Sequence, residues 1–167
     1  LVGLSKCPDY VVNRGHTFAE YRETALAARK RGIPLCTHLI VGLPGESERH
    51  CHATLDSVLD IGVDGLKLHP LHVVKHTRLA QEWRCEEYRP LEKAAYLRLA
   101  ADLIERTPEH VVFHRVTATA SREILLAPAW CAEKWNVING IEHELRRRES
   151  RQGRLAASQE VKLKHVA

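Results

Sequence analysis

The sequence predicts an α/β fold in which parallel strands alternate with helices. Short apolar, β-branched runs alternate with longer amphipathic segments along most of the chain. Glycine follows two of the amphipathic segments directly, at Gly32 and Gly62, where a left-handed residue commonly ends a helix. Strand–helix–strand repeats of this kind are typical of βαβ units and a parallel sheet.

The first elements follow from capping signals and apolar runs. Residues 1–5 are expected to end a strand. Thr17 and Glu20 have the spacing of a capping box, which predicts a helix over residues 17–31. Residues 35–41 are nearly all apolar or β-branched, as expected for a strand that is covered on both faces.

The second half continues the alternation with one less regular stretch, which we expect between residues 71 and 89. Residues from about Ser150 onward are polar and are expected to fray. The remaining elements are expected as helices at 47–61, 77–83, 91–106, 121–126 and 133–148, and as strands at 65–69 and 111–114.

Three or four strands are too few to close an eight-stranded barrel, so an open half-barrel is expected. The chain begins inside the apolar run Leu1 to Leu4 and contains no methionine. We therefore expect it to be an internal fragment of a longer protein, with the missing strands upstream.

Composition places the chain among globular proteins of the cytoplasm. Of the 167 residues, 44% are hydrophobic and 28% are charged. No apolar run approaches the roughly 20 residues that span a bilayer, and no signal peptide opens the chain, so no membrane partner is expected. The five cysteines are scattered without a C-x-x-C pair, which indicates reduced thiols.

The net charge of +4 is concentrated near the end of the chain. Arg146, Arg147 and Arg148 are followed closely by Arg151 and Arg154. Such a run suits a polyanion such as RNA, but it also suits the solvated end of a helix, whose dipole favours basic side chains. Both interpretations stay open at this point.

Ligands of parallel sheets bind at the carboxyl ends of the strands, and three segments follow strands there: 5–16, 42–46 and 69–76. In the segment 42–46, glycine allows close backbone approach to a ligand and Pro44 stiffens the turn. Exposed backbone amides and carbonyls at the end of a strand can form hydrogen bonds with the edge of an adenine base. A connecting turn without a ligand role is the alternative.

Two further polar groups lie on these segments. Arg14 can pair with a carboxylate in bidentate fashion, or it can make a local salt bridge. One interpretation of His69, His72 and His76 is a metal site, which would make the protein a small hydrolase with a metal ion bound by histidines. The odd spacing of His69 and His72 on an extended segment directs them to opposite faces, which favours histidines around a ligand cleft instead.

Taken together, these segments resemble the C-terminal half of a radical S-adenosylmethionine (radical SAM) protein. The most similar subgroup is that of the bacterial YhcC-like proteins, related to the Elongator catalytic subunit and the oxygen-independent coproporphyrinogen oxidase. The resemblance covers nearly the whole chain. The shared motifs, in order, are Gly3-Leu4-Ser5, Asn13-Arg14-Gly15-His16, His38 to Glu46, Gly65 to Lys75, Thr77, Leu79-Ala80, His114-Arg115, Leu125 to Pro128 with Trp130, and Gln152-Gly153.

The resemblance implies a (β/α)6 partial TIM barrel, of which this chain supplies the C-terminal half with its last three strands. A small C-terminal α/β extension follows. The implied division places the barrel at residues 1–85, the extension at 86–149 and a basic, polar tail at 150–167.

The resemblance also implies the cofactors. A 4Fe-4S cluster passes an electron to S-adenosylmethionine, and the resulting 5′-deoxyadenosyl radical abstracts a hydrogen atom from an unidentified substrate. By position, Arg14 matches the arginine that pairs with the methionine carboxylate, and His38 lies near the ribose. The residues implied to contact S-adenosylmethionine are Ser5, Arg14, His38, Gly42, Leu43, Pro44, Leu68, His69 and Pro70.

This sequence departs from the family pattern in ways that bear on activity. It contains no C-x3-C-x2-C, so the cluster ligands are expected upstream of this chain, and the chain alone is expected to be inactive. Ser5 stands where relatives often have glutamine. The alternative to the radical SAM fragment is a non-catalytic, RNA-binding remnant that uses the arginine-rich segment.

Overall fold

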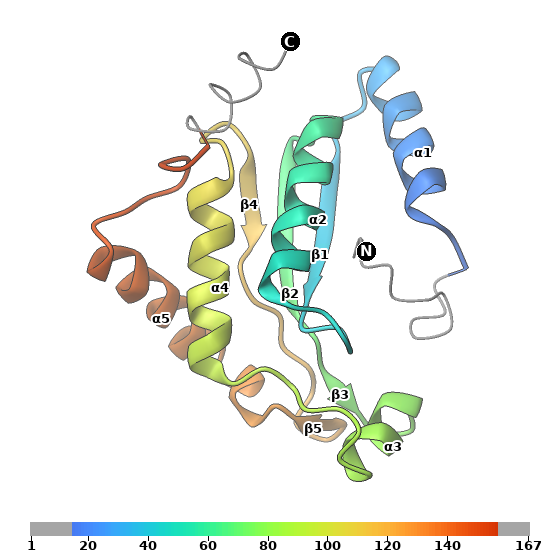
Figure 1. Ribbon diagram of the computed structural model, residues 1–167, viewed down its shortest axis with the longest axis vertical. Helices are drawn as coiled ribbons and strands as arrows, with labels where there is room; N and C mark the ends of the chain where they lie inside the picture. The colour runs from blue at the N-terminus through green and yellow to red at the C-terminus, as the bar shows by residue number, and fades with distance from the viewer. Residues whose placement is uncertain (1–14, 157–167) are drawn as a thin grey trace.

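A three-stranded parallel sheet organises the computed structural model, which describes residues 15–156 (Figure 1). The strands are β1 (Cys36–Val41), β2 (Gly65–Pro70) and β4 (Val112–Arg115), in the order β1-β2-β4. Both pairings are parallel, which confirms the predicted α/β fold with a parallel sheet. The strand predicted at residues 1–5 lies outside the described residues.

Three helices lie close to the ranges expected from the sequence, and two of them carry the expected end signals. In α1 (Phe18–Lys30), the Thr17 amide donates to the Glu20 carboxylate at 2.6 Å, so the predicted capping box is confirmed. Helix α2 (Glu48–Ile61) ends on Gly62, whose φ is 81°. Helix α4 (Lys93–Arg106) connects the second sheet strand to the third.

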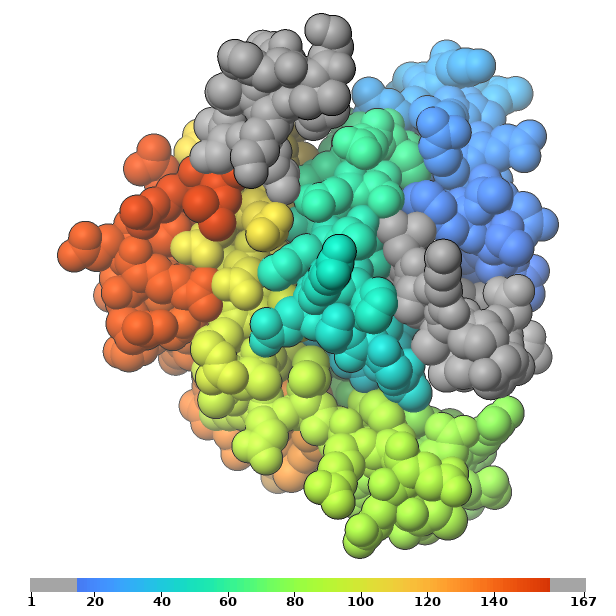
Figure 2. Space-filling view, viewed as in Figure 1, coloured from blue at the N-terminus to red at the C-terminus, as the bar shows by residue number. Residues whose placement is uncertain are grey.

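The core lies between one face of this sheet and the helices. Leu39 and Val41 of β1 and Leu66 and Leu68 of β2 are buried in one cluster with α2 and α4 side chains. Full burial of such a side chain contributes roughly 1.5–3 kcal/mol. In the space-filling view, side chains of α2 and α4 close over this side of the sheet (Figure 2). The alternate residues of the strands therefore face the other side of the sheet, which is termed the open face of the described part of the chain.

A second, smaller unit lies beyond the carboxyl ends of β1 and β2 (Figure 1). It contains α3 (Arg78–Arg84) and the antiparallel pair β3 (Val73–Val74) and β5 (Leu125–Ala127). The helix predicted at 121–126 is wrong, because the Lys75 amide donates to the Ile124 carbonyl at 2.8 Å and the following residues pair with β3. A short apolar run does not distinguish a strand from a helix.

The C-terminal part completes the helix layer. Helix α5 (Lys134–Arg147) packs against α4 after a short 3-10 helix, η1 (Ala129–Ala132). Fraying from Ser150 is wrong for residues 150–156, because the Gln152 side chain donates to the Pro108 and Val111 carbonyls at 2.8 and 2.7 Å. The expected extension at 86–149 supplies α4 and β4 to the main layer, and its boundaries stay a prediction.

Within residues 15–156, none of the helices combines the length and apolar character that crossing a lipid bilayer requires.

Candidate functional site

The turn after β1 is held in a conformation that suits glycine. Gly42 has a φ of 93°, and a Cβ at this position would lie 3.1 Å from the Leu91 side chain. The Tyr88 hydroxyl donates a 2.8 Å hydrogen bond to the Gly42 carbonyl. Tyr88 belongs to the core of the small second unit, so that unit fixes the turn.

The neighbouring turn residues and the end of β2 extend this edge. Leu43 is buried and Pro44 is half-buried, and the Leu71 amide donates to the Val41 carbonyl at 2.9 Å. Leu68 is fully buried on the helix-covered face of the sheet. Only its backbone, like that of Pro70, can therefore border a ligand at the strand end.

His38 and His69 form a flat, polar surface on the open face of the sheet. Their rings stack with centroids 5.2 Å apart and an interplanar angle of 13°. The His69 Nε2 atom is buried and makes no hydrogen bond within the described part of the chain. A buried polar atom of this kind is costly unless a ligand or water supplies a partner.

Both imidazoles are held in the neutral form near neutral pH. Burial, followed by the positive charges nearby, lowers the pKa of His69 to about 4. Burial and then the charge of Lys67 lower the pKa of His38. The open face thus presents ring nitrogens that donate or accept hydrogen bonds without carrying a charge.

The structure brings most of the predicted site residues together. His38, Gly42, Leu43, Pro44, Leu68, His69 and Pro70 lie on β1, β2 and the turn between β1 and α2. Ser5 and Arg14 lie outside the described residues. His72 is half-buried, and its Nε2 atom lies 3.2 Å from the Ala118 carbonyl.

Sequence reasoning missed four residues at this site. Lys67, His114 and Arg115 share the open face with His69, and the alternation in Gly65 to His69 already places Lys67 on that face. Tyr88 gave no local signal, because its partner Gly42 is 46 residues away in the chain.

The described residues do not fit an iron–sulfur cluster. Between residues 15 and 156, no three His, Cys, Asp or Glu side chains gather in a way that could hold a metal ion. The sequence also lacks a C-x3-C-x2-C segment. The glycine turn and the unpartnered His69 nitrogen, in contrast, fit an adenosyl ligand that is contacted by backbone and by aromatic faces.

The arginine-rich end of α5 is occupied by ion pairs. Arg148 contacts Asp102, Glu105 at 2.8 Å and Glu144 at 2.8 Å. Arg146 pairs with Glu142 at 2.6 Å, and Arg147 pairs with Glu144 at 2.8 Å. Most of the positive charge that the sequence places here is therefore neutralised by the protein itself.

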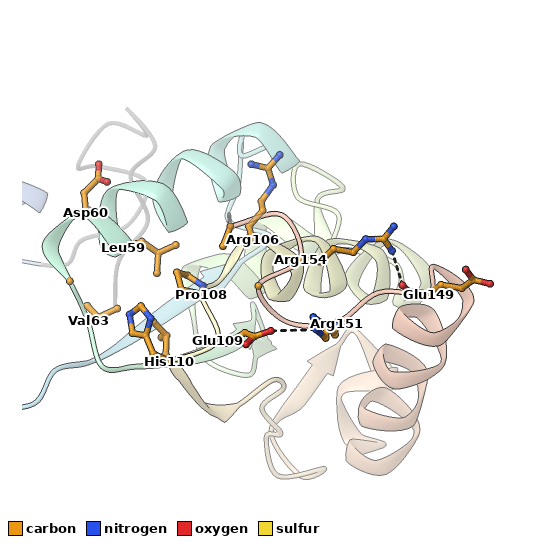
Figure 3. Close-up of a pocket in the computed structure, with 14 residues that line it drawn as sticks. Leu59, Asp60, Val63, Arg106, Pro108, Glu109, His110, Glu149, Arg151 and Arg154 are labelled. Atoms are coloured by element: carbon orange, nitrogen blue, oxygen red, sulfur yellow. Dashed lines mark hydrogen bonds and ion pairs between the residues drawn. The ribbon is translucent and has the colours of Figure 1, made fainter. Parts of the chain in front are cut away.

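A cavity of about 810 Å³ opens at the opposite, amino edge of the sheet (Figure 3). Its walls come from the ends of α2 and α4 and from residues 149–156. Arg151 and Glu109 point toward each other there at 3.3 Å, and Arg154 donates to the Glu149 carbonyl at 2.7 Å. Acidic and basic groups alternate around this cavity, so it has no marked preference for one sign of charge.

This chain is similar to known protein families and to individual known proteins. A family model described as the Radical_SAM C-terminal domain matches residues 63–147, and one described as the Radical SAM superfamily matches residues 9–58. Protein YhcC of Escherichia coli is 48% identical over 134 residues, which are 80% of this chain and 43% of that protein. The chain thus spans less than half the length of this relative.

Two further matches extend the comparison. The tRNA uridine(34) acetyltransferase of Dehalococcoides mccartyi is 33% identical over 109 residues, which are 64% of this chain and 24% of that protein. The solved structure of Elp3 from the archaeon Methanocaldococcus infernus, with an N-terminal deletion, matches with a TM-score of 0.68 and 18% identity. That match covers 81% of this chain and 33% of the Elp3 chain, and it shows the shared fold.

Proposed function

Because the chain belongs to the radical SAM superfamily and to its YhcC-like subgroup, we propose that it forms the adenine and carboxylate side of an S-adenosylmethionine site. The observation that carries this proposal is the carboxyl edge of the sheet. There, the glycine turn at Gly42 follows the strand that carries His38, whose ring stacks on His69, and one buried nitrogen of His69 has no hydrogen-bond partner within residues 15–156.

Each proposed contact uses a feature of this edge. The backbone at Gly42, Leu43 and Pro44 borders one side of the adenine, and the backbone from Leu68 to Pro70 borders the other. His38 faces the ribose as a neutral hydrogen-bonding group, and His69 offers its Nε2 atom. Ser5 and Arg14 are proposed from the resemblance alone, with Arg14 pairing the methionine carboxylate.

S-adenosylmethionine supplies, in this superfamily, a radical that removes a hydrogen atom from a substrate. The residues of this chain would bind and orient the cofactor and exclude water from its adenine side. We propose that the cluster ligands belong to another part of the full-length protein, since neither the sequence nor the described residues provide them.

An RNA substrate is a further proposal for the full-length protein. It is supported by the relative that is named as a tRNA uridine(34) acetyltransferase. The alternative of a non-catalytic remnant that binds RNA through the arginine-rich segment is disfavoured, because Arg146, Arg147 and Arg148 are held by carboxylates of α4 and α5.

The proposal is tested by Arg14→Ala in the full-length protein, with S-adenosylmethionine binding measured by calorimetry. Loss of one partner of a charge-assisted pair is expected to weaken binding by ~2 kcal/mol, about thirtyfold. The control is Arg22→Ala, which removes an exposed arginine of α1 and should leave the affinity unchanged. Equal affinities for the Arg14 variant and the unmodified protein would refute the assignment.

A further inference from the structure

A row of basic side chains crosses the open face of the main sheet. The register places His38 of β1 opposite Lys67 of β2, and Lys67 opposite Arg115 of β4. The β2–β4 register shifts by one residue between Leu66 and Lys67, a bulge that lets both His114 and Arg115 lie on the side of Lys67. Arg115 acts electrostatically on both His38 and His69, as expected for a side chain on their face of the sheet. His114 lies on this side too, because a Cβ on Gly65 would meet its ring at 2.7 Å.

This row has no acidic partner among the described residues. The three strands Cys36–Val41, Gly65–Pro70 and Val112–Arg115 contain no aspartate or glutamate. Within residues 15–156, no hydrogen bond or ion pair involves the side chain of Lys67 or Arg115. Asp64, just before β2, instead accepts from the Leu35 amide at 2.7 Å.

The positive charges of Lys67 and Arg115 lower the stability of the sheet unless an anion neutralises them. Like charges directly across neighbouring strands destabilise a sheet. The same positive field acts on the histidines, since Lys67 and Arg115 both lower the pKa of His38 and of His69. No carboxylate opposes this effect at either imidazole. The face is therefore an unneutralised positive patch in the part of the chain that the structure describes.

We propose that the row formed by His38, Lys67 and Arg115 binds a phosphate group of the substrate. Two permanent positive charges match the charge of about −1.5 to −2 that a phosphate monoester carries at neutral pH, or two neighbouring phosphodiesters. A single carboxylate would leave one cation without a partner. Neutral imidazoles beside the row supply additional hydrogen-bond donors to phosphate oxygens.

The proposal deepens the proposed function and rests on it, because the substrate of the S-adenosylmethionine site would lie on the same open face. The row begins at His38, the residue proposed to face the ribose, and runs away from it across β2 and β4. A phosphate on Lys67 and Arg115 would thus anchor the substrate beside the adenosyl group, while Arg14 remains assigned to the methionine carboxylate.

The test uses the full-length protein and inorganic phosphate, with the ring C–H signals of His38 and His69 followed by nuclear magnetic resonance. Saturable shifts of both signals are expected. The double variant Lys67→Gln/Arg115→Gln is expected to weaken phosphate binding at least ~tenfold, through loss of two charge-assisted contacts. The matched control Lys30→Gln/Arg84→Gln removes the same charge from exposed positions on α1 and α3 and should change binding less than ~twofold.

Binding experiments with RNA and with inorganic phosphate, run side by side, distinguish a nucleic-acid backbone from a small phosphate ester. A single-stranded RNA oligonucleotide that binds more tightly than phosphate, with the same loss in the double variant, supports a nucleic-acid backbone. Phosphate binding without RNA binding supports a small phosphate ester. The absence of any saturable shift in the unmodified protein, or equal losses in the double variant and the control, overturns the proposal.

The two proposals fail separately. If the unmodified protein binds S-adenosylmethionine but phosphate leaves His38 and His69 unchanged, only the phosphate site is wrong. If phosphate binds at the row and S-adenosylmethionine does not bind, the anion site stands and the proposed function fails. Should the double variant fold poorly, competition in the unmodified protein decides, since sulfate should displace phosphate and chloride at equal ionic strength should not.

Discussion

Two basic regions of this molecule differ in what surrounds their charges. At the end of α5, Arg146, Arg147 and Arg148 each contact a carboxylate of α4 or α5. On the open face of the sheet, Lys67 and Arg115 face each other across two strands with no carboxylate on those strands. A high density of basic residues in the sequence therefore does not by itself indicate unneutralised charge, since the acidic partners of each residue decide how much charge is left for a ligand.

Arg148 illustrates the structural use of a cation. Its side chain is 20% exposed, and the guanidinium bridges Asp102 and Glu105 of α4 to Glu144 of α5, so it holds the two helices together. A planar, multiply donating group is suited to this bridging role. The sequence left a basic surface and a solvated helix end both open here, because Asp102 and Glu105 lie more than 40 residues away in the chain.

The largest expected effect comes from removing this bridge. Arg148→Met should lower the free energy of unfolding by about 3 kcal/mol, because it leaves Glu105 and Asp102 without their partner in a partly buried site. Chemical denaturation measures the change. Lys67→Met, on the open face, should leave stability within ~1 kcal/mol of the unmodified protein or raise it, since it relieves like-charge repulsion. Equal losses in both variants would remove the contrast between the two regions.

Acid should affect the open face in a definite pH window. The folded pKa of His69 is lowered from 6.5 to about 4, mainly by burial and then by His38, Arg115, His72 and Lys67. Between these values the unfolded chain binds more protons, so stability should fall as the pH drops from about 6.5 to 4. His69→Asn should flatten the denaturation free energy in that window. An unchanged slope would show that His69 is not held neutral.

A second pH window, at lower pH, belongs to the arginine-rich region. Hydrogen bonds from Arg147 and then Arg148 lower the pKa of Glu144 from 4.5 to about 2. Its contribution to stability is present above about pH 4.5 and is lost as the pH falls toward 2. Glu144→Gln should reduce the acid dependence between these values without changing it near pH 6. A change near pH 6 would mean that the two regions are not independent.

Local signals predicted the elements well, and long-range contacts explain what was missed. The capping box at Thr17 and the glycine stop at Gly62 act within one helix turn, so the sequence shows them directly. The strand at Leu125–Ala127 depends on pairing with β3, some 50 residues earlier in the chain, and was predicted as a helix. Residues 150–156 were predicted to fray because the partners of Gln152 lie in another segment.

The roles of the site residues stay a prediction, although their placement can be compared with the sequence. His38, Gly42 and His69 were proposed from strand ends and family motifs, and the structure stacks His38 on His69. The hydrogen bond from Tyr88 and the alignment of Lys67 with Arg115 require the tertiary register. Neither feature can be read from the local sequence, because each joins segments that lie far apart in the chain.

We propose that S-adenosylmethionine binds at the carboxyl edge of the sheet. Titration of the full-length protein with S-adenosylmethionine, with nuclear magnetic resonance shifts mapped by residue, tests this most directly. Saturable shifts are expected at His38, Gly42 and His69, with no change at Gly62 and His110 in the amino-edge cavity. Shifts centred on the amino-edge cavity, or none at His38, Gly42 and His69, would contradict it.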